Sequence, residues 1–291
     1  MSNNSLINLG DLSKTATVLV EKISDAVGGL FKPHQIVRVA KAEAEAERIR
    51  AECQIQVSDL QRRAVHRFLE EEAKRQANIE AITAKALPLL EEKSSPQDME
   101  DDWITNFFDK SRIVSDEDMQ RLWSKVLAGE ANAPGTFSKR TVNLLADLDK
   151  RDAEAFTNLC GFGWMIGNVI PLVFDPQHEL YNHHGIFFGT LTHLDTLGLI
   201  DFHSVAGFSL LKIPKRATVS YHEKPVQLTF PNDAENTLDV GKVLLTHAGQ
   251  ELATLCGAKP VEGFFEFVCE RWRGQGLIPK EATAPSTSAG S

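Results

Sequence analysis

The 291-residue sequence has no apolar run that approaches the roughly 18 residues expected of a membrane-spanning helix. The nearest candidate, residues 161–174, is shorter and contains glycine and proline, so we interpret it as a buried core segment. The N-terminus also lacks the basic, apolar and small-residue pattern of an export signal. We therefore expect a cytoplasmic protein, or one that is peripheral to the inner membrane.

Cysteine is scarce, and the signature motifs of several enzyme classes are absent. The sequence contains no GxGxxG, GxxxxGK[ST], HExxH or GxSxG, so nucleotide binding, zinc peptidase and hydrolase chemistry are unsupported. A formal net charge of −9 argues against a chain dominated by contacts with phosphate backbones, although it permits a local basic patch. The cysteines are dispersed and form no CxxC pair, which predicts reduced thiols at Cys53, Cys160, Cys256 and Cys269.

Two groups of residues resemble chemical sites, but each has a simpler interpretation. The three histidines within residues 178–184 have metal-binding side chains, yet the adjacent pair would point to opposite sides of an extended surface loop. A Cys–His nucleophile would pair Cys160 or Cys256 with His247, but no orienting third group is visible and buried structural thiols are preferred. We therefore predict no catalytic residue, no metal site and no cofactor.

Residues 36–93 are the most informative stretch, because they predict one long and highly charged helix. The run contains no glycine, and its only proline is Pro88 near the far end. A rod that reaches on the order of 80 Å must lie along a second copy, a partner or its own chain. Its period favours lateral packing over a strict left-handed coiled coil. Apolar residues at three- and four-residue steps predict a narrow assembly stripe: Ile49, Cys53, Val57, Leu60, Ala64 and Phe68.

An amphipathic helix is predicted before this rod, within residues 6–32, and it should end near Gly28. The polar side of this helix mixes lysines with acidic residues, whereas a helix that lies on a membrane surface is normally more basic. Packing against the body of the protein or a second copy is therefore preferred over membrane contact. The face that would meet the membrane or a partner consists of Leu12, Ala16, Leu19, Ile23, Val27 and Leu30.

A compact helical domain is predicted over residues 97–160. Its second helix should begin at Ser115, with Asp118 completing a capping box, and Ser138 should cap the third. The acidic residues near the helix starts are interpreted as capping and solubilising groups rather than as a divalent-cation site. The first helix should bury one apolar face that contains Trp103, Phe107, Phe108 and Ile113.

Short apolar runs separated by glycine, proline and asparagine predict an α/β module after residue 161. A helix is expected over residues 187–197, and a further helix capped by Thr246 should follow the strands. Helix, hairpin and helix in this order predict a winged-helix-like module. The expected strands cover residues 208–213, 217–221, 226–230 and 240–245.

Local positive charge on the expected wing provides the nucleic-acid hypothesis. A wing can lie along phosphates, and its candidate contacts are Lys212, Lys215, Arg216 and Lys224. The candidate recognition helix within residues 189–197 contains no lysine or arginine and does contain Asp195, although a helix that reads the major groove presents such side chains. A protein-packing role for this module is therefore preferred over nucleic-acid binding.

Three blocks of sequence carry a resemblance to a known family. They are ATVLVEKISDAVGGLFKPHQIVRVAKAEAEAERI, the central VSDEDMQRLWSKVLAGEANAPGTFSKRTVNLLADLD and the late VLLTHAGQELATL. Together they resemble an uncharacterised bacterial family, domain of unknown function number 2806, and WSKVLAGE followed by PGTFSKRT is the most specific part. The resemblance implies an association with phage defence, and it assigns no catalytic residue.

The sequence therefore predicts a mainly helical α+β protein with five segments. These are an amphipathic N-terminal segment (1–34), a long charged helix (35–95), a helical domain (96–160), a winged-helix-like α/β module (161–280) and a disordered tail (281–291). The preferred functional hypothesis is a non-enzymatic interaction or sensor protein that self-associates or binds a protein partner. The alternatives are a DNA-binding winged-helix protein and a membrane-associated effector that acts through its N-terminal helix.

Overall fold

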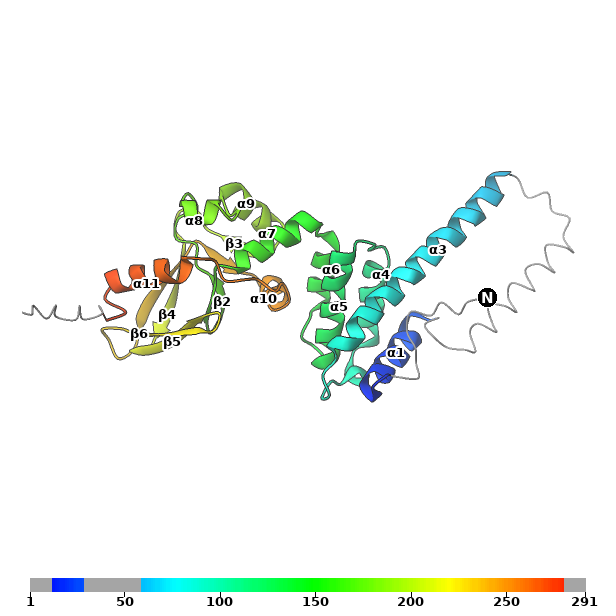
Figure 1. The fold of residues 1–291 in the computed structure, drawn as a ribbon, viewed down its shortest axis with the longest axis horizontal. Helices are drawn as coiled ribbons and strands as arrows, with labels where there is room; N and C mark the ends of the chain where they lie inside the picture. Colours follow the sequence, from blue (N-terminus) through cyan, green and yellow to red (C-terminus); the bar gives the residue numbers. More distant parts are fainter. Residues whose placement is uncertain (1–11, 29–58, 280–291) are drawn as a thin grey trace, which may run out of the picture. The chain divides into compact units, whose positions relative to one another are not determined.

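The computed structural model describes residues 12–28 and 59–279, and the fold is α+β with 53% helix and 16% strand. The mainly helical α+β class expected from the sequence is confirmed. The chain divides between Lys150 and Arg151 into two compact units, which we call unit 1 and unit 2 (Figure 1). Helix α7 (Lys150–Cys160) falls within the predicted helical domain of residues 96–160, but all of it except Lys150 belongs to unit 2.

Unit 1 is an assembly of helices built around aromatic side chains. Helix α3 packs against α5, while α4 packs against α6 and α1. Trp103 stacks on Phe107, whose ring also meets Trp123 edge to face, and all three side chains are buried. The elements of unit 1 are α1 (Lys14–Val27), α3 (Asp59–Ala86), the 3-10 turns η2 (Leu87–Leu89) and η3 (Pro96–Asp98), α4 (Asp101–Ser111), α5 (Glu117–Asn132) and α6 (Lys139–Asp147).

Two of the helix boundaries in unit 1 agree with the sequence patterns. Helix α1 ends at Gly28, whose φ of 72° lies in the region that glycine adopts without a Cβ penalty. The predicted cap Ser138 accepts a hydrogen bond from the Thr141 N–H at 3.2 Å and opens α6.

Three other details differ from the sequence predictions. Asp116, not Ser115, caps α5, because its carboxylate accepts from the backbone N–H groups of the first turn. Ile113 follows the end of α4, so it leaves the helical register and is 67% exposed instead of lying on the buried face. The long helix ends at Ala86 rather than continuing to residue 93, and Pro88 lies in the 3-10 turn that follows it.

The loop between α5 and α6 is held by one buried carboxylate. Glu130 accepts hydrogen bonds from the N–H groups of Gly135 at 2.7 Å and Phe137 at 2.8 Å. The indole N–H of Trp103 donates to the Phe137 carbonyl at 2.6 Å, and the Phe137 ring packs directly over Gly129. The most specific sequence block, WSKVLAGE followed by PGTFSKRT, therefore contains the residues that connect α4, α5 and the start of α6. We call this set of contacts the Glu130 joint.

Unit 2 combines short antiparallel sheets with helices. Its largest sheet has the strand order β2-β1-β5-β6, and two further pairs are β3-β8 and β4-β7. The elements of unit 2 are α7 (Lys150–Cys160), β1 (Gly163–Ile166), β2 (Asn168–Pro171), α8 (Glu179–Asn182), α9 (Phe188–Thr196), β3 (Ile200–Phe202), β4 (Phe208–Ile213), β5 (Arg216–Tyr221), β6 (Lys224–Thr229), β7 (Asn236–Gly241), β8 (Val243–Leu245), α10 (His247–Ala253) and α11 (Phe264–Gly274).

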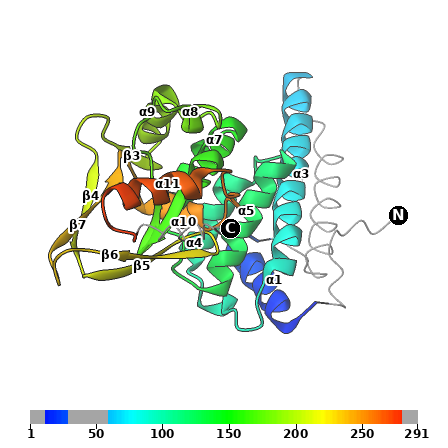
Figure 2. The ribbon, with the colours of Figure 1, turned by 60° about the vertical axis from the view of Figure 1, so that its left-hand side comes forward.

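Helix α11 covers the β1 and β5 part of the largest sheet (Figure 2). The Trp164 ring on β1 stacks on Phe265 and meets Trp272 edge to face, and both partners belong to α11. Tyr221 on β5 also stacks on Trp164, and its ring meets Phe264 edge to face. These aromatic contacts form the core of unit 2 and fix the position of α11.

The winged-helix interpretation stays a prediction. Helix α9 is followed by β3, and β3 pairs with β8 in antiparallel orientation. A helix followed by an antiparallel strand pair is what a winged-helix module would contain. The chain between β3 and β8 forms four further strands, however, and the short strand expected over residues 240–245 is split between β7 and β8. The predicted β5–β6 hairpin is present, with a two-residue turn at His222 and Glu223.

In neither of the two described ranges is there a helix with the length and apolar character needed to cross a bilayer.

The Glu130 joint should contribute measurably to the stability of the protein. Glu130→Ala leaves two backbone N–H groups without their acceptor, and we expect it to lower the free energy of unfolding by about 2–3 kcal/mol. Urea denaturation followed by circular dichroism measures this loss. Glu100→Ala is the matched control, since that exposed side chain makes no capping hydrogen bond and its loss should cost less than about 0.5 kcal/mol. Equal effects of the two substitutions would refute the assignment.

The stability of unit 2 should decrease at alkaline pH. Burial raises the pKa of Tyr181 and of Tyr221 above the ordinary value of 10.0. Folding therefore favours the protonated phenols, so their stabilisation is complete below about pH 10 and is lost as the pH rises through the folded-state values. Tyr181→Phe and Tyr221→Phe should each reduce stability at neutral pH but flatten its decline above about pH 10. Urea denaturation at a series of pH values tests this, and an unchanged slope in both variants would contradict it.

Candidate interaction surface on helix α3

Helix α3 is buried over only its C-terminal half. Its buried residues there are Asn78, Ile79, Ile82, Thr83 and Ala86, and this face packs against α5. Polar contacts fix the rotation of the helix. The Gln120 amide on α5 donates to Asn78 at 3.3 Å and accepts from Lys85 at 2.8 Å, and Asn78 itself donates to the Arg112 carbonyl at 2.8 Å.

The N-terminal half of α3 is exposed and carries large apolar side chains. Leu60 is 68% exposed and Phe68 is 60% exposed, and every described residue from 59 to 74 is exposed. We call the exposed apolar residues of this half the α3 strip: Leu60, Ala64, Val65, Phe68 and Leu69. Scattered apolar residues are normal on a surface, but a continuous group on one helix marks an interaction site.

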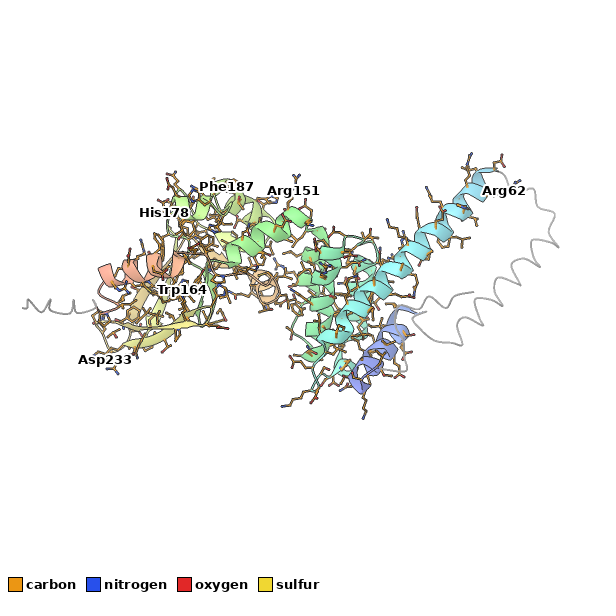
Figure 3. All side chains as sticks on the ribbon, viewed as in Figure 1. Arg62, Arg151, Trp164, His178, Phe187 and Asp233 are labelled. Carbon is orange, nitrogen blue, oxygen red and sulfur yellow. The ribbon has the colours of Figure 1, made fainter. Side chains whose placement is uncertain are left out.

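The α3 strip continues the face that is buried farther along the same helix. An α-helix has about 3.6 residues per turn, so Phe68 lies about five turns from Ala86, and Ala64 lies about five turns from Ile82. Helix α5 is shorter than α3 and covers only the C-terminal half of this face. Figures 1 and 2 show α3 extending beyond the other described helices of unit 1, and Figure 3 places the Arg62 side chain at this projecting end.

Charge on the projecting half is arranged in two blocks. A basic block of Arg62, Arg63 and Arg67 precedes an acidic block of Glu70, Glu71 and Glu72. Arg67 of the basic block forms an exposed ion pair with Glu71 at 3.5 Å, and Arg75, which follows the acidic block, pairs with Glu72 at 3.2 Å. Such exposed pairs stabilise the helix only slightly. The order of the two blocks along the helix is more informative about a possible partner. The basic block lies toward the N-terminal end of the strip, and the acidic block follows its C-terminal end.

The predicted assembly stripe is only partly described by the structure. Leu60, Ala64 and Phe68 lie together on the α3 strip, whereas Ile49, Cys53 and Val57 lie outside the described residues. The sequence analysis did not select Val65 and Leu69. Their positions are apolar and at helical spacing, but they lie beside the narrow stripe rather than on it.

The structure buries the central part of the predicted N-terminal face within unit 1. Ala16, Leu19 and Ile23 are buried where α1 packs against α4 and η3. Lys22 adds an ion pair with Asp101 at 2.6 Å. Leu12 and Val27 are half-buried, and Leu30 lies outside the described residues. Contacts within unit 1 therefore cover Ala16, Leu19 and Ile23, and a role of this face toward a membrane or a partner stays a prediction.

The four basic residues of the expected wing are spread along the chain from β4 to β6. Arg216 pairs with Thr229 at the open end of the β5–β6 hairpin, while Lys224 pairs with Tyr221 beside its turn. At about 3.4 Å per residue these two ends are roughly 17 Å apart. Lys215 already forms an ion pair with Asp233 at 2.8 Å, and the Lys224 ammonium lies 5.0 Å from the centroid of the Phe265 ring.

Lys212 lies at the other end of β4 from Phe208, in a left-handed conformation with a φ of 60°. Its neighbourhood also contains acidic residues: Asp233 bonds to Lys215, and Glu235 precedes β7. The nucleic-acid hypothesis stays a prediction.

The structure also describes the three histidines within residues 178–184. His178 caps α8, because its Nδ1 atom accepts a hydrogen bond from the Leu180 N–H at 3.2 Å. The described residues contain no group of three or more His, Cys, Asp or Glu side chains that could hold a metal ion. A further histidine, His193 on α9, binds Asp152 on α7 at 2.7 Å and ties these two helices together.

Comparison with known families gives a match over much of the chain. The model of the family described as "protein of unknown function (DUF2806)" matches residues 62–269, which is more than half of the sequence. The chain therefore belongs to the DUF2806 family, and the resemblance inferred from the sequence blocks is confirmed. No curated protein and no solved structure gives a significant match.

The burial of α1 predicts that its apolar face is needed for folding. Leu19→Asp places a charge in the contact with α4, and we expect it to lower the free energy of unfolding by at least about 3 kcal/mol. Lys14→Asp is the control, since it adds an aspartate at an exposed position of the same helix. Urea denaturation and liposome flotation should be measured together. Loss of flotation by Leu19→Asp with unchanged stability would contradict the packing role and favour membrane contact.

Proposed function

We propose that this protein is a non-enzymatic assembly protein that self-associates through the α3 strip and leaves unit 2 to dock or sense a further partner. The observation that supports this proposal is the apolar face of α3, which is buried against α5 over one half and exposed over the other. Burying apolar surface is the main favourable contribution to most protein association. The exposed half therefore provides both the driving force and the geometry for a helix–helix contact.

A second copy of the chain in antiparallel orientation is the occupant that we propose. In a parallel pair the basic blocks at Arg62 and Arg63 would face each other, as would the acidic blocks at Glu71 and Glu72. An antiparallel pair places each basic block beside the acidic block of the other copy. Such a contact has a twofold axis and uses the same surface of both copies, which is the commonest form of homodimer.

Several residues of the α3 strip suit this role. Phe68 offers the largest exposed apolar side chain of the strip, and Leu60 and Leu69 extend the contact toward both ends. Large apolar side chains at the centre of an interface usually carry most of its binding energy. The charged blocks that flank them would fix the orientation of the two helices more than they would raise affinity.

Light scattering on the full chain tests whether the α3 strip drives assembly. We expect the wild-type protein to be a dimer and the double variant Leu60→Glu, Phe68→Glu to dissociate at least about tenfold more readily, since the charges oppose burial. The control is Ala77→Glu, which adds a glutamate at an exposed position on the opposite side of α3. Circular dichroism should show unchanged helix content, because all three positions are exposed.

Two results would overturn the proposal. One is a monomeric wild-type protein at the concentrations used. The other is a dimer that the double variant does not weaken. If the protein is monomeric and the double variant lowers the free energy of unfolding, the strip is covered within the same chain instead of by a second copy.

Charge reversal distinguishes the antiparallel pair from a parallel one. Arg62→Glu with Arg63→Glu should weaken an antiparallel dimer, because acidic side chains would then face acidic side chains. Adding Glu71→Arg and Glu72→Arg should restore it. A parallel pair would respond little to the first change, since it replaces one like-charge contact with another. Analytical ultracentrifugation at low and high salt measures both steps, and screening at high salt should reduce the differences.

A further inference from the structure

Two cysteines that are distant in the sequence lie together in unit 2. Cys160 is the last residue of α7, and Cys256 follows the end of α10. Cys160 lines the same pocket as Thr254 and Gly257, which lie on either side of Cys256 in the sequence. The Cys256 thiol donates its hydrogen to the Ala253 carbonyl, with the sulfur 3.2 Å from the oxygen.

The backbone around the two thiols is fixed by one tyrosine. The Tyr221 hydroxyl donates to the Gly161 carbonyl at 2.7 Å and accepts from the Val261 N–H at 2.6 Å. Gly161 is adjacent to Cys160, and Val261 follows the Cys256 loop. A Cβ on Gly161 would lie only 2.9 Å from the Lys259 carbonyl oxygen, so the two segments are in direct contact. This packing holds both cysteines in place without a covalent bond.

An open pocket of about 310 Å³ gives small molecules access to this region. Cys160 lines one part of the pocket, and Ala253, Thr254 and Gly257 from the Cys256 loop line another. The two thiols differ in exposure, since Cys160 is 5% exposed and Cys256 is half-buried. The hydrogen bond to Cys256, together with burial, raises the pKa of the Cys160 thiol well above its usual value, so Cys160 remains protonated.

We propose that Cys160 and Cys256 are a redox-sensitive thiol pair that a peroxide converts into a disulfide. The more exposed Cys256 sulfur attacks one peroxide oxygen, the O–O bond breaks, and a sulfenic acid and a first water are formed. The Cys160 sulfur then attacks the sulfenic sulfur, the S–O bond breaks, and the Cys160 proton leaves with the hydroxyl group as a second water. The two thiols lose two electrons in total, and the peroxide accepts them.

The disulfide would close most of unit 2 into one covalent loop, from the end of α7 to the loop after α10. A long loop of this kind restricts the unfolded chain, so the oxidised protein should melt about 5 °C or more above the reduced one. The pair requires neither the α3 strip nor a dimer. Its test is therefore independent of the proposed assembly function.

Peptide mapping after peroxide treatment tests the pair in the full chain. The starting protein carries Cys53→Ser, so that the described cysteines alone are present. After treatment with hydrogen peroxide, we expect a non-reducing digest to contain the Cys160 peptide joined to the Cys256 peptide, and dithiothreitol to separate them. The melting temperature should rise on oxidation and return on reduction.

Matched variants assign the link to this pair. Cys269→Ser should retain the disulfide, because Cys269 is buried in α11 and is not part of the pair. Cys256→Ser, at the half-buried position, should abolish it. Cys160→Ala should abolish it as well and cause sulfinic acid to accumulate on Cys256. Absence of the Cys160–Cys256 peptide, a link to Cys269 instead, or sulfinic acid on Cys256 of the parent protein before any link forms would overturn the proposal.

Discussion

The packing of α3 against α5 is the contact on which the proposed role of unit 1 depends. Ile79, Ile82 and Ala86 bury one face of the helix, and the Asn78–Gln120 hydrogen bond fixes its rotation. A continuous helix transmits this orientation to its other end, because each turn is hydrogen-bonded to the next. The position of Phe68 is therefore set by contacts about three turns or more away. The exposed strip has a defined direction, which is what an interaction surface requires.

The two units use polar groups in different ways to hold their loops. In unit 1, the Glu130 carboxylate accepts from two backbone N–H groups, and a glycine leaves space for the Phe137 ring. In unit 2, the Tyr221 hydroxyl joins two segments by acting as donor and acceptor together. Both arrangements satisfy buried backbone groups that would otherwise destabilise the fold. Unit 2 in this way brings its two thiols together without a metal or a covalent link among the described residues.

Local signals in the sequence predicted much of the helical structure but little of the sheet. Ser138 was a recognisable helix cap because a hydroxyl before an apolar repeat acts locally. Ser115 and Asp116 are both good caps, so only the tertiary structure decides between them. Strands β1 and β2 were missed because the mostly apolar run over residues 161–174 has no polar alternation, although Met165 on β1 is 47% exposed. Helix α11 was missed because the aromatic residues of FFEFVCERWRG fill several sides of one helix, where they contact two strands.

In the candidate site, too, the sequence predicts local features, whereas burial depends on contacts between distant parts of the chain. Helices α1 and α3 both carry an apolar face at helical spacing, yet the first is buried and half of the second is exposed. The spacing of apolar residues is similar in the two helices, so the difference in burial comes from the lengths of their packing partners. Helix α4 and the turn η3 cover α1, whereas α5 is too short to cover the whole of α3. An apolar face predicts that a partner exists, but the identity of the partner depends on how far the rest of the fold extends. For α3 this leaves Leu60 and Phe68 exposed beyond the part of the helix that α5 covers, and that exposure is the basis of the proposed antiparallel second copy.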